Sequence, residues 1–90
     1  MTKQAHRQAK RLSPIGLEGI EACRAIVARH AAAKVNEVMV DAFSASGITE
    51  VYDALKPENQ VKFVTLSVRK ATDVAFRLID TFRLINKQGG

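Results

Sequence analysis

A strip of polar residues on the first predicted helix combines side chains that bind metals or transfer protons. The strip contains Cys23, His30, Lys34, Glu37 and Asp41. At 100° per residue these positions fall within roughly 60° of one another, and they include common zinc ligands and general acids or bases. His30 and Glu37, however, are two turns or about 10 Å apart, and no Glu-x-x-His spacing occurs. We therefore predict a solvated strip that holds neither a metal nor another cofactor.

Nucleophilic and phosphoryl-transfer chemistry has little more support. Cys23 has no glycine-rich turn or helix N-terminus to activate it, and His30 is two turns away. His30 with Lys34 one turn later is an alternative phosphoryl-accepting site, but such a pair arises readily by chance. The chain has no phosphate-binding glycine loop, no Cys-x-x-Cys and no Gly-x-Ser-x-Gly. We therefore predict that the protein is not an enzyme.

Positive charge is concentrated at the start of the chain. The net charge is +5 over 90 residues, and residues 1–34 contain seven basic residues against two acidic ones. The basic residues of the first twelve lie on one side if that segment is helical, and such a stripe can follow phosphates. We predict nucleic-acid contact, with DNA or RNA, through Lys3, Arg7, Lys10, Arg11, Arg24 and Arg29. A purely solubilising arm is the alternative.

Two long helices with a short helix between them are predicted to follow the arm. Ser13-Pro14 is a helix-start signal, and the stretch 44–47, which ends in Gly47, predicts where the first long helix stops. A break near residues 31–34, which would give a compact monomeric bundle, is the rival, but no proline or glycine there supports it. Residues 48–55 form the short helix, with a strand as the alternative.

Pro57 begins the last predicted helix, which runs to about residue 87. Its apolar positions alternate steps of three and four residues, as in a coiled coil. Two further apolar residues, Phe76 and Leu84, lie outside this stripe. The predicted partner interface comprises Val61, Val64, Val68, Ala71, Ala75, Leu78, Phe82, Ile85, Phe76 and Leu84.

The fold prediction is an all-α long helical hairpin that pairs into a dimeric four-helix bundle. The first helix is apolar on two sides, so one hairpin cannot cover all of its apolar surface. The domain assignment is residues 1–12 as a basic N-terminal arm, 13–87 as a single helical domain and 88–90 as a flexible tail. The homodimer is therefore the predicted partner state.

The sequence also bears on protein–protein binding, on a helix-turn-helix motif and on the cellular compartment. A protein–protein adaptor, inhibitor or accessory subunit is the main alternative, because apolar surface remains outside the stripe. A helix-turn-helix at residues 48–55 and beyond is disfavoured, since the last helix is too long for a recognition helix. No apolar run approaches the ~20 residues of a membrane span, and the lone Cys23 fits a reducing, cytoplasmic compartment.

Overall fold

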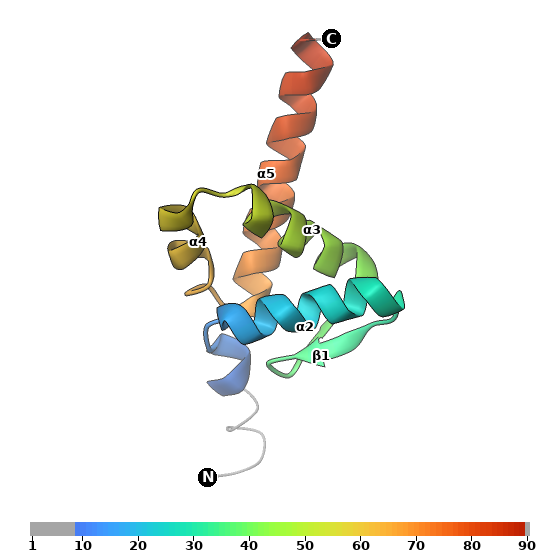
Figure 1. Cartoon of the computed structure of the whole chain (residues 1–90), viewed down its shortest axis with the longest axis vertical. Coiled ribbons are helices and arrows are strands. Elements are labelled where there is room, and N and C mark those ends of the chain that lie inside the picture. The colour runs from blue at the N-terminus through green and yellow to red at the C-terminus, as the bar shows by residue number, and fades with distance from the viewer. Residues whose placement is uncertain (1–8, 90) are drawn as a thin grey trace.

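The computed structural model describes the backbone of residues 9–89 and the side chains of residues 9–81. A helical turn at residues 9–12 is followed by α2 (Gly16–Arg29), β1 (Ala33–Val35), β2 (Val38–Val40), α3 (Ala42–Ala54), α4 (Pro57–Phe63) and α5 (Val68–Gly89). Helices α2 and α3 pack together, and α3 also packs on α5. The β1–β2 hairpin and α4 lie on opposite sides of the α2–α3 pair, and α5 extends beyond α3 (Figure 1). The predicted all-α hairpin of two long helices is therefore wrong.

The first predicted long helix is divided because α2 ends at Arg29. His30 adopts a left-handed conformation with φ of 54°, and the backbone N–H of Ala31 donates to the carbonyl of Ile26 at 3.4 Å. Helices commonly end with such a left-handed residue, which is usually glycine. A histidine fills that position here, so the sequence carried no glycine or proline signal. The rival break near residues 31–34 is close to where the chain turns.

The residues that follow form a β-hairpin instead of continuing the helix. Strands β1 and β2 are antiparallel, and Val35 pairs with Val38 across the turn. The two loop residues, Asn36 and Glu37, both have positive φ values, 50° and 63°. Two successive residues with positive φ are typical of a type I′ turn, which matches the twist of paired strands. The alternation of exposed Lys34 and buried Val35 turns one side of the hairpin toward the core.

Helix α3 begins where the sequence predicted a helix end. The side chain of Asp41 caps it by accepting a hydrogen bond from the backbone N–H of Ser44 at 2.7 Å. Gly47 is therefore inside the helix, where a Cβ would lie 3.3 Å from Cζ of Phe76 and 3.4 Å from Cδ1 of Ile79. Its small size permits the close approach of α3 and α5 and does not provide a C-cap. The predicted short helix is thus the second half of a longer one.

The last predicted helix is also divided. Pro57 begins α4 as expected, but α4 ends at Phe63 and α5 begins only at Val68. The intervening residues accept backbone hydrogen bonds from the first residue of α2 and from the residue before it. Ile15 N–H donates to the carbonyl of Leu66 at 2.7 Å, and Gly16 N–H donates to that of Val64 at 2.9 Å. These contacts between distant segments hold residues 64–67 out of the helix.

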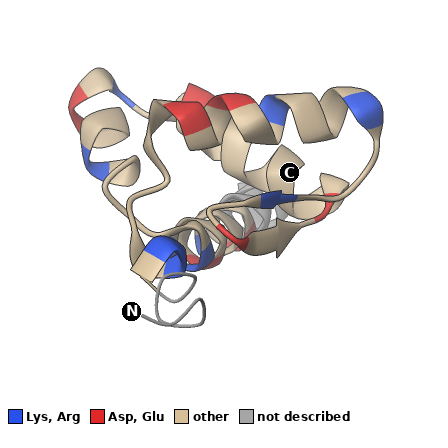
Figure 2. Ribbon diagram, turned by 90° about the horizontal axis from the view of Figure 1, so that it is seen from below, with Lys and Arg blue, Asp and Glu red and all other residues tan. Residues whose placement is uncertain are grey.

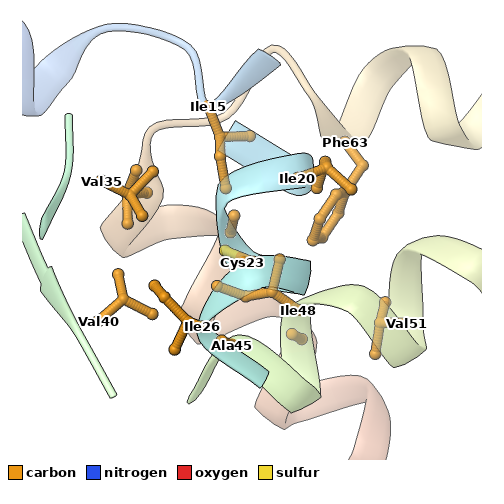
Figure 3. Packing of buried hydrophobic residues seen from close by; sticks show 13 residues of the cluster. Ile15, Ile20, Cys23, Ile26, Val35, Val40, Ala45, Ile48, Val51 and Phe63 are labelled. Atoms are coloured by element: carbon orange, nitrogen blue, oxygen red, sulfur yellow. The ribbon is translucent and has the colours of Figure 1, made fainter. Parts of the chain in front are cut away.

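The core lies between α2, the hairpin, α3 and the first half of α5, and Figure 3 shows its side chains meeting around Cys23. The buried apolar residues are Ile15, Ile20, Cys23, Ile26, Val35, Val40, Ala45, Ile48, Val51, Phe63, Val68, Ala71 and Ala75. Two of the α5 residues are alanines, which leave room for α3. This core is contained within one copy of the chain.

Candidate functional site

The start of α5 and the segment before α2 meet at one end of the molecule. Pro14 and Ser67 form an isolated antiparallel β-bridge. The hydrogen bond from Ile15 to Leu66 extends this contact by one residue on each strand. The bridge therefore brings the helical turn at residues 9–12 close to the first turn of α5, and Figure 2 views the molecule from this end.

Four cationic residues gather around this bridge. Lys10 and Arg11 precede Pro14, and Arg69 and Lys70 follow Ser67; all four are exposed. We call this group the basic end. Arg11 Nε donates to the carbonyl of Glu37 at 3.2 Å, which ties the turn at residues 9–12 to the hairpin loop. Within residues 9–81, no ion pair within 4 Å neutralises any of these four side chains.

The first turn of α5 is an unusual place for two of these cations. The N-terminus of a helix carries a partial positive charge, so acidic residues stabilise that position and cationic ones destabilise it. The first turn of α5 has no acidic residue and contains Arg69 and Lys70. The helix dipole therefore adds to the positive potential of the basic end. This arrangement destabilises the helix slightly, but it favours the binding of an anion at that end.

The other predicted nucleic-acid contacts are elsewhere. Arg24 forms a two-pronged ion pair with Asp53 of α3, with nitrogen–oxygen distances of 2.9 and 2.7 Å. This pairing lowers the pKa of Asp53 and raises that of Arg24. Arg29 lies at the last residue of α2, about 20 Å from the start of that helix. The structure thus brings Lys10 and Arg11 together but leaves both α2 arginines apart from them, while Lys3 and Arg7 lie outside the described residues.

The polar strip of the first predicted helix is dispersed over three elements. Cys23 is buried in the core, where desolvation raises its pKa to about 11. His30 is the exposed cap of α2, and Glu37 lies in the hairpin loop. Asp41 caps α3, and the hydrogen bond from Ser44 lowers its pKa. The described residues contain no group of three or more potential metal ligands.

A second candidate site, which the sequence did not predict, is an apolar groove between α3 and α5. Its volume is about 400 Å³, and Glu50 is the single charged residue among those that line it. Phe43 and Phe76 form one wall as a stacked pair with ring centroids 5.3 Å apart. Phe43 is nevertheless 69% exposed, although its ring stacks on that of Phe76. We call this feature the α3–α5 groove.

The predicted partner interface is distributed over several environments. Three side chains are fully buried in the core: Val68, Ala71 and Ala75. Two line the α3–α5 groove: Phe76 and Leu78. Two belong to α4 and the turn after it, one exposed and one half-buried: Val61 and Val64. Three have side chains outside the described residues: Phe82, Leu84 and Ile85.

A signal for the groove is present in the sequence once the helix boundaries are known. Phe43, Gly47, Glu50 and Ala54 are spaced by three or four residues, so they share one face of α3. Because the prediction ended one helix at residues 44–47 and began another at 48, it divided this face. Phe76 was recognised as lying off the apolar stripe, and it does lie in the groove.

Comparison with known proteins gives no relative from which a function could be inferred, so the inference rests on the structure itself. No family model, no curated protein and no solved structure matches this chain. Among the described residues, no helix has the length and apolar character needed to cross a membrane. The basic end and the α3–α5 groove are therefore the two surfaces of the described residues that suit a binding partner.

Proposed function

We propose that the protein is a small non-enzymatic binding protein that contacts nucleic-acid phosphates through its basic end. The observation that carries this proposal is the Pro14–Ser67 bridge, next to which lie two pairs of cations that are far apart in the sequence. A cluster of exposed Lys and Arg without acidic partners is the electrostatic footprint of a phosphate-binding surface. Lys3 and Arg7, which precede the described residues, extend the same basic segment in sequence.

The cluster supports binding to the phosphate backbone and not to particular bases. Cations that neutralise phosphates release condensed counterions, and this makes affinity fall steeply with salt. Lys10, Arg11, Arg69 and Lys70 offer four such contacts. Arg11 is oriented by its hydrogen bond to the hairpin loop, so part of the cluster is preorganised.

The test is a titration of short duplex DNA, and of RNA of equal length, at several salt concentrations. The double variant Arg69→Gln/Lys70→Gln should reduce the slope of log K against log salt by about 2. The double variant Lys56→Gln/Lys62→Gln removes the same charge from exposed positions around α4 and serves as the matched control. We expect the control to retain the wild-type slope. Equal slopes for both variants, or no salt-dependent binding by the wild type, would contradict the proposal.

A second candidate function is association with a protein surface by helix packing. It is favoured by the α3–α5 groove, whose apolar lining and exposed Phe43 resemble the grooves that accept amphipathic helices. This function predicts that a charge placed in the groove disrupts an assembly without changing the salt dependence of nucleic-acid binding. Parallel measurement of both properties on Phe43→Glu separates the two candidates.

A further inference from the structure

An exposed aromatic ring lies where the α3–α5 groove adjoins a second hollow of the surface. Phe43 lines the groove near the start of α3, and it is 69% exposed although its ring stacks on that of Phe76. The next residue, Ser44, lines the second hollow, which has a volume of about 350 Å³. Arg69 of the basic end lines the same hollow. The groove and the basic end are therefore neighbours, and one ligand can contact both.

One face of α5 connects the cations to the aromatic pair. Arg69, Thr72 and Phe76 are spaced by three and four residues, so they share a face of the helix. Seven residues of helix separate Arg69 from Phe76 by about 10 Å along the axis. In a stacked nucleic-acid strand the phosphates follow one another about every 3.4 Å along the axis. A strand of about three nucleotides therefore spans the distance from the cation to the ring.

The second hollow combines a cation with exposed apolar surface. Its lining includes Arg69 and all three residues of strand β2, of which Met39 is 63% exposed. A nucleotide has matching parts, because its phosphate is anionic and the flat faces of its base stack on aromatic rings and guanidinium planes. The lining thus suits a nucleotide better than it suits a purely apolar ligand.

The acidic residues near Phe43 do not oppose an anionic strand strongly. The carboxylate of Asp41 is occupied as the cap of α3, and Asp73 forms an ion pair with Arg77 at 3.1 Å. Glu50 lines the groove seven residues beyond Phe43, about 10 Å along α3. Cations that lack an ion pair within residues 9–81 therefore dominate the charge on the basic-end side of the ring.

We propose that Phe43 is a stacking platform for a base of single-stranded nucleic acid whose phosphates bind the basic end. Proteins that bind single strands combine a positively charged surface, which follows the backbone, with aromatic rings on which bases stack. Bases within a duplex already stack on their neighbours, so this contact favours a single strand over a duplex. The inference rests on the proposed function and narrows its ligand to the single-stranded form.

Titrations of the full chain with a short single-stranded DNA, with RNA of the same sequence and with the corresponding duplex DNA test this inference. Phe43→Leu removes the aromatic ring and keeps an apolar side chain. It should weaken binding of whichever single strand the wild type binds more tightly by about tenfold. The loss should be the same at every salt concentration, because stacking releases no counterions. Duplex affinity should stay within about twofold of the wild type.

Two further variants serve as controls for the affinity measurements. Val61→Ala removes exposed apolar surface from α4, outside both hollows, since Val61 is 67% exposed and lines neither of them. Phe43→Tyr keeps an aromatic face at the site. Both variants should bind the single strand within about twofold of the wild type.

A spectroscopic measurement reports stacking without relying on affinity. The chain contains no tryptophan, so Phe43→Trp introduces a single indole at the site, and Val61→Trp introduces one on α4. Addition of the single strand should quench the fluorescence of Phe43→Trp, because a base stacks on the indole. It should leave the fluorescence of Val61→Trp unchanged.

The outcomes distinguish this inference from the proposed function. Unchanged single-strand affinity in Phe43→Leu overturns the inference, and salt-dependent binding that Arg69→Gln/Lys70→Gln weakens would still support the proposed function. Equal weakening of single-strand and duplex binding by Phe43→Leu also overturns it, because Phe43 would then act through the fold. A wild type that binds none of the three nucleic acids contradicts both.

Discussion

The start and the middle of α5 are surrounded by surfaces of different chemistry. Around its first turn lie the four cations of the basic end, and along its middle lies the apolar α3–α5 groove. The basic end depends on a backbone bridge between Pro14 and Ser67, which joins segments 53 residues apart in sequence. The groove depends on one small residue, Gly47, which lets α3 approach Phe76.

Because of this difference, we expect the two surfaces to respond differently to substitution. Cations act through long-range fields that tolerate small changes in geometry, so the basic end needs only approximate proximity. An apolar groove needs side chains to meet at van der Waals distance, so its shape changes with single atoms. Substitutions in the core, in the groove, beside the bridge and at a surface ion pair test this comparison.

The largest expected effect is on the free energy of unfolding, and it differs between substitutions on the two faces of α3. Ile48 is completely buried on the core face, whereas Phe43 is 69% exposed on the groove face. Ile48→Ala should lower the free energy of unfolding by about 2–5 kcal/mol, because it leaves a cavity. Phe43→Ala should lower it by less than about 1 kcal/mol, since most of its surface is already in water. Urea unfolding at a concentration where the protein is monomeric measures both.

A smaller effect is expected at Gly16, next to the bridge that forms the basic end. Gly16 has a φ of +65°, and a Cβ placed there would meet no atom within 4 Å. Gly16→Ala should therefore cost about 1–2 kcal/mol through backbone strain alone. Gly16→Asn is the matched control and should cost less, because asparagine tolerates the left-handed region better. Equal thermal unfolding of both variants would show that the backbone can relax without strain.

Several elements of the fold could be predicted from local sequence, and others could not. Pro57 was recognised as a helix start because proline is preorganised for the first helical turn. The break after Arg29 was weighed as the rival near residues 31–34 and set aside, and the break after Phe63 was missed, because neither contains glycine or proline. A left-handed histidine produces the first break, and hydrogen bonds from Ile15 and Gly16 accompany the second. Tertiary contacts of this kind leave no trace in helical periodicity.

The candidate sites likewise divide into residues that local sequence identifies and residues that only tertiary contacts bring together. Lys10 and Arg11 were predicted because a run of cations is visible in any conformation. Arg69 and Lys70 were not, since only the bridge places them beside that run. The polar strip was an artefact of extending α2 through residues that form the hairpin. The groove was missed because Gly47 was interpreted as a stop signal when its role is close packing.

The smallest expected effect on stability comes from the ion pair between Arg24 and Asp53. This pair joins α2, which leads away from the basic end, to α3, which forms a wall of the groove. Two hydrogen bonds from Arg24 hold the pKa of Asp53 below its usual value. A carboxylate whose pKa is lowered on folding stabilises the protein above its unfolded pKa, and this stabilisation is lost as pH falls through the folded pKa. Both side chains are partly exposed, so the contribution is that of a surface pair.

Asp53→Asn should therefore unfold more easily than the wild type at neutral pH, by less than Gly16→Ala does. The difference should shrink as pH falls below about 4, the ordinary aspartate pKa, because the wild-type carboxylate then becomes neutral too. Urea unfolding from pH 7 to pH 3 measures this convergence. The variant should keep some acid sensitivity, since the cap at Asp41 also has a lowered pKa. A constant difference across the whole range would mean that Asp53 acts through packing and not through its charge.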